Sequence, residues 1–268
     1  MPTIVANGLE MAYEVHGAGP PLVMLHGATT SGREQFAGLA PILAQGFRVY
    51  LPDARGHAGT ASDPADRWTT TDLVADLDAF VDAIGISTFH LLGYSMGGMT
   101  ALHYASTFPA RLRTLVAISI GTEREPRLAV GRTLMDPDRI DRDDPRWAEA
   151  LAARHDPIHG QGSWRSLLRA IVDDIAAQPL LTARNLRAID APAIVIAGDR
   201  DPFVPVGQAL ALSRQVRDGR LLILPRVGHD VVGDPTALLP TGLSEFYRST
   251  EAVARDRAGE THVTEAAR

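Results

Sequence analysis

The sequence has no cysteine, no lysine and no long apolar run, and each absence excludes a class of chemistry. Without cysteine there is no thiol nucleophile, thiolate metal site or disulfide framework. All 26 basic residues are arginine, which excludes a Schiff-base lysine, a serine–lysine dyad and the lysine of a phosphate-binding loop. No apolar stretch approaches the roughly 18 residues of a membrane span. We therefore expect no cysteine-based or lysine-based site and no membrane partner.

The remaining composition is that of an ordinary globular chain. Its 268 residues are 45% hydrophobic and 22% charged, which suits one large α/β domain with an inserted subdomain. The net charge of −6 argues against a nucleic-acid partner. The first eight residues lack the basic and apolar regions of a signal peptide, so we expect a cytoplasmic protein. Nothing in the sequence indicates an oligomeric state.

Strand and helix patterns alternate through most of the chain. Strands are expected at residues 4–6, 11–15, 22–25, 47–51, 89–92, 112–118, 193–197 and 221–224, and helices at 34–45, 71–84, 99–105, 206–215 and 236–247. Several strands are continuously apolar, which is typical of a mostly parallel sheet covered by helices on both faces. Loops that follow such strands open at the carboxyl edge of the sheet, where these folds bind ligands.

The alternation stops between residues 121 and 189, where charges, prolines and tryptophans replace it. Candidate helices at 147–154, 163–177 and 182–188 predict an inserted helical cap. The sequence thus divides into a first core part (1–120), the cap (121–189) and a second core part (190–248). The last residues, 249–268, are polar with mixed charge and no apolar stripe, so we expect a disordered tail.

The most informative motif is Gly-Tyr-Ser-Met-Gly-Gly at residues 93–98, between an apolar strand and a helical pattern. A serine on so sharp a turn needs glycine neighbours, because side chains there would clash with the strained backbone. This pattern is typical of a nucleophile elbow, in which the amino end of the helix favours developing negative charge. The same six residues also fit an ordinary glycine-rich turn. The motif indicates a nucleophile only if a base, a carboxylate and an oxyanion site occur elsewhere in the chain.

Two later loops contain the missing groups. Residues 198–205 hold Asp199 and Asp201, and residues 227–230 hold His229. Each loop directly follows an expected strand, so a parallel sheet would bring both to the edge that carries Ser95. Nucleophile, acid and then histidine is the chain order of α/β hydrolases.

Together with the His26-Gly27 loop and the strand order, these motifs make the chain resemble the α/β-hydrolase superfamily over about residues 3 to 248. The resemblance implies that Ser95 is the nucleophile, His229 the general base and Asp201 the orienting acid. It favours Asp201 over Asp199 because family members usually place the acid in the Asp-Pro-x-x-Pro part of this loop. Asp199 then has a supporting structural role.

The resemblance also implies an oxyanion hole made of backbone N–H groups, those of Ala28 and Met96. The reaction that the implied triad and oxyanion hole carry out needs no metal and no cofactor. His26 is expected to shape the oxyanion loop and Tyr94 to border the site.

The pocket residues are less well defined by the sequence. Trp147, Trp164 and Met135 either line an acyl pocket or form the core of the cap itself. His155 and His159 have helical spacing and could suggest a metal pair. Pro157 between them makes a regular helix improbable, so we predict no metal site and place both histidines on the inner face of the cap.

One further loop, Asp-Ala-Arg-Gly-His at residues 53–57, is similar to a family loop with a mostly structural role. Many relatives continue with Gly-x-Ser directly after the histidine, whereas residues 58–62 here read Ala-Gly-Thr-Ala-Ser. We assign no catalytic role to this loop.

The function predicted from the resemblance is hydrolysis of a small or medium carboxylic ester or lactone. Serine at the elbow disfavours haloalkane dehalogenases and epoxide hydrolases, which use aspartate there. A carbon–carbon bond hydrolase and a cofactor-free haloperoxidase or perhydrolase are alternatives on the same triad, although Tyr94 and residues 28–30 differ from the usual carbon–carbon hydrolase pattern. A non-catalytic ligand-binding protein is a further alternative, which the complete set of triad residues argues against.

Overall fold

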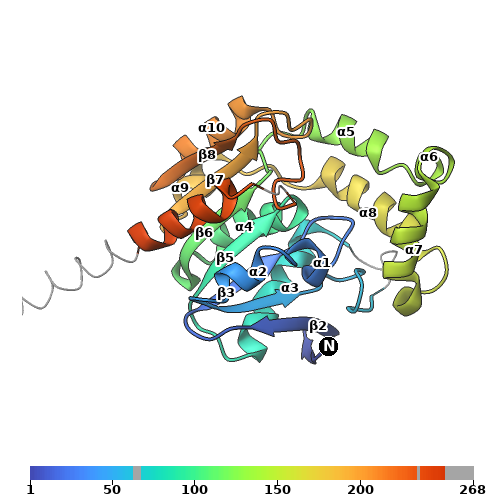
Figure 1. Ribbon diagram of the computed structural model, residues 1–268, viewed down its shortest axis with the longest axis horizontal. Coiled ribbons are helices and arrows are strands. Elements are labelled where there is room, and N and C mark those ends of the chain that lie inside the picture. The colour runs from blue at the N-terminus through green and yellow to red at the C-terminus, as the bar shows by residue number, and fades with distance from the viewer. Residues whose placement is uncertain (63–67, 234–235, 251–268) are drawn as a thin grey trace, which may run out of the picture.

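The computed structural model describes residues 1–62, 68–233 and 236–250, and the predicted tail lies outside the described residues from position 251 onward. An eight-stranded sheet with strand order β1-β2-β4-β3-β5-β6-β7-β8 forms the centre of the molecule (Figure 1). Its strands are β1 (Thr3–Ala6), β2 (Leu9–His16), β3 (Pro21–Leu25), β4 (Arg48–Pro52), β5 (Phe89–Tyr94), β6 (Leu112–Ile118), β7 (Ala193–Gly198) and β8 (Gly219–Leu224).

The strands from β4 to β8 in this order are all parallel, and β2 pairs with its two neighbours in the antiparallel sense. Every residue of β5 and β7 is buried, as expected for strands covered on both faces. The structure confirms the predicted α/β fold and its mostly parallel sheet. The loops after β3, β5, β7 and β8 therefore share one edge.

Helices cover both faces of the sheet (Figure 1). One apolar cluster joins the sheet to α3 (Thr70–Ala83), α4 (Met96–Thr107) and α10 (Val206–Gln215). The other cluster joins it to α1 (Gly32–Gln35), α2 (Ala40–Leu43) and a helix at residues 238–250.

Two details of the predicted helices are wrong. The single helix expected at 34–45 is two short helices, because Gly38 interrupts the pattern and Pro41 stands at the start of α2, where proline is tolerated. The helix expected from Thr71 is capped two residues earlier by Thr69, whose side chain accepts a hydrogen bond from the N–H of Asp72.

Five helices lie between β6 and β7: α5 (Arg127–Leu134), α6 (Pro137–Asp143), α7 (Pro145–His159), α8 (Ser163–Ala177) and α9 (Ala183–Arg187). We call α5 to α8 the helical insertion. It stands to one side of the sheet (Figure 1) and has its own apolar cluster, which includes Leu151 and Trp164. By contrast, α9 packs against α4 and α10, and its Leu186 is buried in the core of the sheet.

The helical insertion differs from expectation in several respects. The sequence did not predict α5 and α6, and the helix expected at 182–188 corresponds to α9, which packs on the core. α7 continues through Pro157 to His159, although the proline made a regular helix improbable. Proline removes one N–H in the last turn, and the side chain of Asp156 closes this turn by accepting from the N–H of Gly162 and the hydroxyl of Ser163. Within the described ranges, no helix is long and apolar enough to cross a membrane.

Candidate active site

Ser95 stands at a sharp turn between β5 and α4, with φ of 52°. This left-handed backbone is strained for any residue other than glycine, and close contacts hold it in place. A Cβ atom at Gly93 would overlap the carbonyl oxygen of Gly97, and one at Gly97 would overlap that of Leu25. The N–H of Ser95 donates to the carbonyl of Ile118 on β6, at 2.9 Å. The elbow is thus fixed by the glycines that the motif contains.

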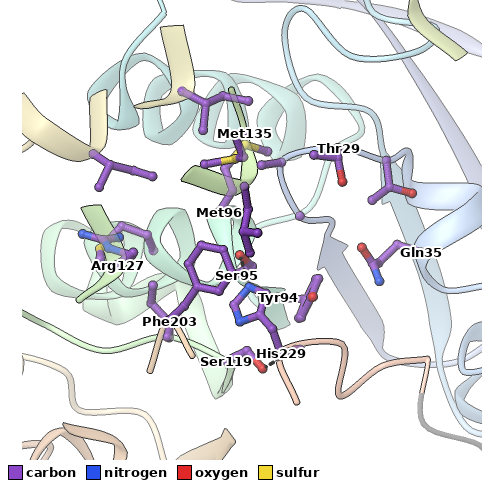
Figure 2. Close-up of a pocket in the computed structure, with 18 of the residues that line it drawn as sticks. Thr29, Gln35, Tyr94, Ser95, Met96, Ser119, Arg127, Met135, Phe203 and His229 are labelled. Atoms are coloured by element: carbon purple, nitrogen blue, oxygen red, sulfur yellow. Dashed lines mark hydrogen bonds between the residues drawn. The ribbon is translucent and has the colours of Figure 1, made fainter. Parts of the chain in front are cut away.

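A continuous hydrogen-bonded chain joins the three predicted triad residues, two of which, Ser95 and His229, are seen side by side in Figure 2. Nε2 of His229 lies 2.9 Å from Oγ of Ser95, and Nδ1 lies 2.8 Å from Oδ2 of Asp201. The Asp201 side chain is fully buried, whereas the His229 side chain is 20% exposed. The arrangement allows Ser95 to donate to Nε2 while the proton on Nδ1 is held by the carboxylate.

The two aspartates of the loop after β7 have different surroundings. Oδ1 of Asp201 accepts from the N–H groups of Phe203 and Val204, at 2.8 and 3.2 Å, so this carboxylate is aimed at His229 by its own loop. Asp199 is exposed and accepts from the N–H of Arg226 at 2.6 Å. It ties the acid loop to the segment after β8 and does not contact His229.

Two residues support His229 that sequence reasoning did not single out. The ring of Phe203 lies 4.3 Å from the imidazole, centroid to centroid, and the hydroxyl of Ser119 donates to the carbonyl of His229 at 2.9 Å. Phe203 belongs to the acid loop and Ser119 follows β6, so their position after strand ends was the available signal. Tyr94 packs on the same imidazole at 5.5 Å.

The N–H groups of Ala28 and Met96 have no hydrogen-bond acceptor among the residues that the structure describes. Both residues are half-buried and line the cavity in front of Ser95. Free N–H groups beside a nucleophile at the amino end of a helix are suited to hold an oxyanion. The carbonyl of Ala28 is held from behind by Nε2 of His57, at 2.9 Å.

His57 belongs to a cluster of three buried histidines, with His26 and His155. The ring of His57 lies 5.0 Å from that of His26 and 5.5 Å from that of His155. Burial is the main cause that lowers the pKa values of His26, His57 and His155, to about 4, 3 and 2 respectively. Arg154 lowers the pKa of His26 and His155 further, and neighbouring histidines do so for His57 and His155. All three rings are therefore neutral at pH 7.

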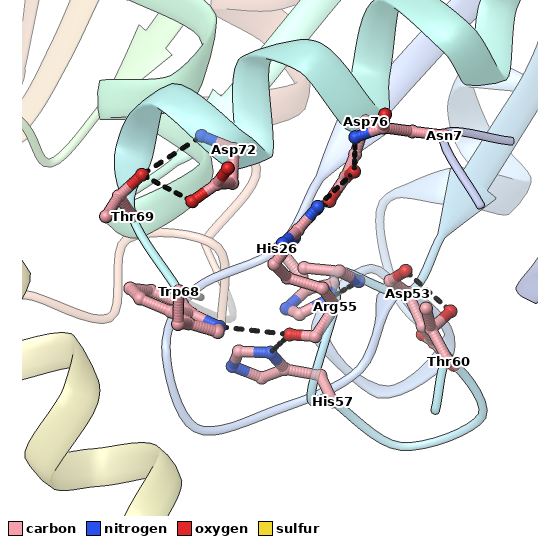
Figure 3. A network of polar contacts seen from close by, with 11 residues as sticks. Asn7, His26, Asp53, Arg55, His57, Thr60, Trp68, Thr69, Asp72 and Asp76 are labelled. Carbon is pink, nitrogen blue, oxygen red and sulfur yellow. Dashed lines mark hydrogen bonds and ion pairs between the residues drawn. The ribbon is translucent and has the colours of Figure 1, made fainter. Parts of the chain in front are cut away.

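Backbone groups hold these three rings, of which His26 and His57 are seen in Figure 3. His26 donates from Nδ1 to the carbonyl of Gly27 and accepts at Nε2 from the N–H of Ala54. His155 accepts at Nδ1 from the N–H of Ala58, at 3.1 Å. The cluster thus joins the loop after β3, the loop after β4 and helix α7 of the helical insertion.

Beneath this cluster, Arg55 forms a buried ion pair with Asp76 of α3, with Nη2 2.6 Å from Oδ1 (Figure 3). Asp76 also accepts from the side chain of Asn7, at 2.7 Å. The carbonyl of Arg55 accepts from the indole N–H of Trp68. The loop of residues 53–57 therefore has the structural role that the sequence indicated.

A cavity of about 550 Å³ opens above Ser95, a volume suited to a small organic ligand. Met96, Tyr94, Phe203 and His229 surround the serine (Figure 2). Trp147 and Met135 of the helical insertion line the cavity and also belong to or border the apolar cluster of the insertion, so they combine the two alternatives that the sequence left open. Arg127 and Gln178 line it too, and sequence reasoning missed both.

Four predicted pocket residues do not line this cavity. His26 is buried behind the oxyanion loop, and His155 is turned toward Ala58. Trp164 is 1% exposed within the apolar cluster of the helical insertion, while His159 borders a separate surface hollow beside Ser62. For the three residues of the helical insertion, helical spacing and aromatic character were a poor guide, because they do not distinguish the inner face of a cap from its core.

One ion pair joins the helical insertion to the rim of the cavity. Arg154 of α7 contacts the carboxylate of Glu34 on α1 and donates to the carbonyl of Thr29, directly after Ala28. No cluster of three or more histidine and carboxylate side chains suited to a metal ion occurs in the described part of the chain.

Comparison with known proteins agrees with this geometry. The family model described as alpha/beta hydrolase fold matches residues 20–187. A 2-hydroxy-6-oxononadienedioate/2-hydroxy-6-oxononatrienedioate hydrolase from Pseudomonas putida is 30% identical over 250 residues, covering 82% of this chain and 85% of that protein. Serine hydrolase BPHL from Mus musculus is 27% identical over 242 residues, covering 85% and 79%.

Among solved structures, the enol-lactonase from Burkholderia xenovorans LB400 has a TM-score of 0.74 at 22% identity and covers 92% of this chain and 100% of its own. At this identity the likeness shows the fold alone. Because the matching family model spans well over half of the chain, the protein belongs to the α/β-hydrolase family.

Proposed function

We propose that this protein is a serine hydrolase that cleaves a small or medium carboxylic ester or lactone. The observation that carries the proposal is the unbroken hydrogen-bonded chain from Ser95 through His229 to Asp201, placed at the floor of the cavity. Such a chain activates a hydroxyl that is otherwise a weak nucleophile.

In this mechanism Oγ of Ser95 attacks the substrate carbonyl as its proton passes to Nε2 of His229. Asp201 holds the imidazole in the required tautomer and stabilises the imidazolium. The N–H groups of Ala28 and Met96 bind the oxyanion, and each such donor typically contributes about 3 kcal/mol in the transition state. His229 then protonates the departing alcohol. Water activated by the same imidazole releases the acid and regenerates Ser95.

A second candidate is cleavage of a carbon–carbon bond beside a ketone, on the same three residues. The relative from Pseudomonas putida supports it, because that protein is named for a substrate with an oxo group and two carboxylates. Enol-lactonase and serine-hydrolase neighbours support the ester or lactone reaction instead. The leaving group departs through an oxygen atom in the ester or lactone reaction and through a carbon atom in the second reaction. Panels of the two kinds of substrate therefore distinguish the two candidates.

The first test is labelling of the purified protein with a fluorophosphonate, followed by peptide mass spectrometry. We expect one adduct, on Ser95, that is absent from His229→Ala. Turnover of an ester and lactone panel, with no turnover of 2-hydroxy-6-oxo-dienoates, would support the first candidate, and the reverse pattern would support the second. A labelled protein that turns over neither panel would contradict both. Absence of the adduct would show that Ser95 is not an activated nucleophile.

A further inference from the structure

One wall of the cavity holds a buried cation with unused hydrogen-bonding capacity. Arg127, on α5, is 7% exposed and lines the cavity to one side of Ser95, opposite Gln35 (Figure 2). Its Nε and Nη2 atoms are buried and have no hydrogen-bond partner among the described residues. An unpaired buried charge is costly, and a native structure keeps one only where another group satisfies it.

The neighbouring carboxylate does not fill this need. Asp174 of α8 lies close enough to act on the charge of Arg127, but its two oxygens accept from the N–H and the hydroxyl of Thr70, at 2.9 and 2.6 Å. Asp174 therefore balances part of the charge without occupying the guanidinium N–H groups. Arg124 donates to the carbonyls of Ile175 and Gln178 and so stays at the end of α8.

The guanidinium remains charged at neutral pH. Burial lowers the pKa of Arg127 to about 10, and Asp174 acts in the opposite direction. Arg124 lowers the pKa of Arg127 further. His103 of α4 also lies near it and has a pKa lowered to about 4 by burial and then by Arg127. Neither the neutral imidazole nor the carboxylate of Asp174 occupies the Nε and Nη2 groups of Arg127.

The other charged groups on the cavity wall are already engaged or differently placed. Arg154 is paired with Glu34, and Asp230 accepts from the N–H of Gly233. Of the cations lining the cavity in the described part of the chain, Arg127 is the one without an ion-pair or hydrogen-bond partner. A planar guanidinium with free N–H groups is the group best suited to a carboxylate.

We propose that the substrate carries a free carboxylate in addition to the bond that is cleaved, and that Arg127 binds this carboxylate through its unoccupied N–H groups. This inference rests on the proposed hydrolase function and narrows its substrate class. The buried Oε1 of Gln178, which also lines the cavity, is likewise without a partner among the described residues.

The test compares matched ester pairs that differ only in the carboxylate. One pair carries it on the acyl side, the mono-4-nitrophenyl ester of glutarate against 4-nitrophenyl pentanoate. The other carries it on the alcohol side, 4-carboxyphenyl butanoate against phenyl butanoate. In one of the pairs we expect kcat/KM to be about 10- to 100-fold higher for the charged ester, as a hydrogen-bonded charge pair provides.

The variant Arg127→Gln should lower this charged-to-neutral ratio at least about tenfold, because the neutral amide keeps a hydrogen bond and loses the charge. Arg132→Gln is the matched control, since Arg132 is an exposed arginine on the same helix, and it should keep the ratio of the unaltered protein. A ratio near one for both pairs in the unaltered protein, or an unchanged ratio in Arg127→Gln, would overturn the inference.

A binding measurement separates this inference from the proposed function. Hexanoate should raise the Tm of the unaltered protein more than hexanamide does, because a ligand that binds only the folded state stabilises it. The measurement uses the unaltered protein alone, so it depends neither on turnover nor on whether a variant folds. Labelling of Ser95 and turnover of neutral esters without any preference for hexanoate would leave the hydrolase in place and overturn the carboxylate site. A preference for hexanoate without labelling of Ser95 would support the carboxylate site and contradict the proposed hydrolase function.

Discussion

Two walls of one cavity differ in how their polar groups are satisfied. On the first wall, both ring nitrogens of His229 have partners at 2.8 and 2.9 Å. On the second, two of the three guanidinium nitrogens of Arg127 are buried with no partner in the described residues. Groups that perform chemistry must be in position before the substrate arrives. Groups that select the substrate can instead gain their hydrogen-bond partners from the substrate itself.

The first wall is tested most strongly by removing its reacting groups. Ser95→Ala and His229→Ala should each lower kcat for ester hydrolysis on the order of 10⁵-fold, because members of such a chain act as a unit. Steady-state kinetics measures this, and circular dichroism checks that the fold is kept. Ser244→Ala is a matched control, since this exposed hydroxyl bonds only the carbonyl of Pro240. A rate within tenfold of the unaltered protein in either site variant would place the chemistry elsewhere.

The next largest effect separates the two aspartates of the acid loop. Asp201→Asn should lower kcat about 10⁴-fold, because an amide no longer fixes the imidazole tautomer. Asp199→Asn should change kcat less than about tenfold, since Asp199 bonds a backbone N–H outside the site. The comparison uses the same kinetic assay on both proteins. The reverse ranking would move the acid to Asp199.

A smaller loss is expected when the oxyanion loop loses support from behind. His57→Phe should lower kcat about 10- to 100-fold with little change in KM, because the imidazole contact with the carbonyl of Ala28 is lost and the neighbouring N–H of Ala28 is then less firmly held in position. His90→Phe is the control, a buried histidine that bonds Thr114 on the neighbouring strand. Equal losses of kcat in both variants would mean that His57 acts on stability alone.

The smallest effect concerns stability and pH. His26, His57 and His155 have pKa values lowered to about 4, 3 and 2. Below pH 6.5 the unfolded chain binds protons at these rings and the folded chain does not, so the free energy of unfolding falls as the pH falls. Each such histidine contributes a slope of up to about 1.4 kcal/mol per pH unit.

Urea unfolding between pH 7 and pH 5 measures this slope. His155→Gln should have a shallower slope than the unaltered protein, because one of the titrating rings is gone and the glutamine amide does not titrate. Identical slopes in the two proteins would show that His155 takes up its proton in the folded state as well, which the burial of its ring argues against.

The features predicted well from the sequence are those fixed by local pattern. Apolar strands followed by loops placed Ser95, Asp201 and His229 at one sheet edge, and the glycines around Ser95 signalled the elbow. The structure confirms the fold and the family, and it brings these three side chains together. Their roles in catalysis remain predictions that the variants above test.

The features that the sequence did not predict depend on contacts between distant segments. Trp164 and Trp147 lie on neighbouring helices of the insertion, yet one is in its core and the other lines the cavity. Arg127 lies in a charged stretch that resembles a solvated surface. Only the packing of α5 against α8 shows that this arginine is buried.

Arg154 contacts two separate parts of the cavity rim at once, the carboxylate of Glu34 and the carbonyl of Thr29. Any displacement of α7 would therefore break an ion pair and also free the loop that carries Ala28. The position of α7 and the position of the Ala28 N–H are thus coupled through one side chain, and salt, which screens exposed charges, would weaken the part of this coupling that Glu34 provides.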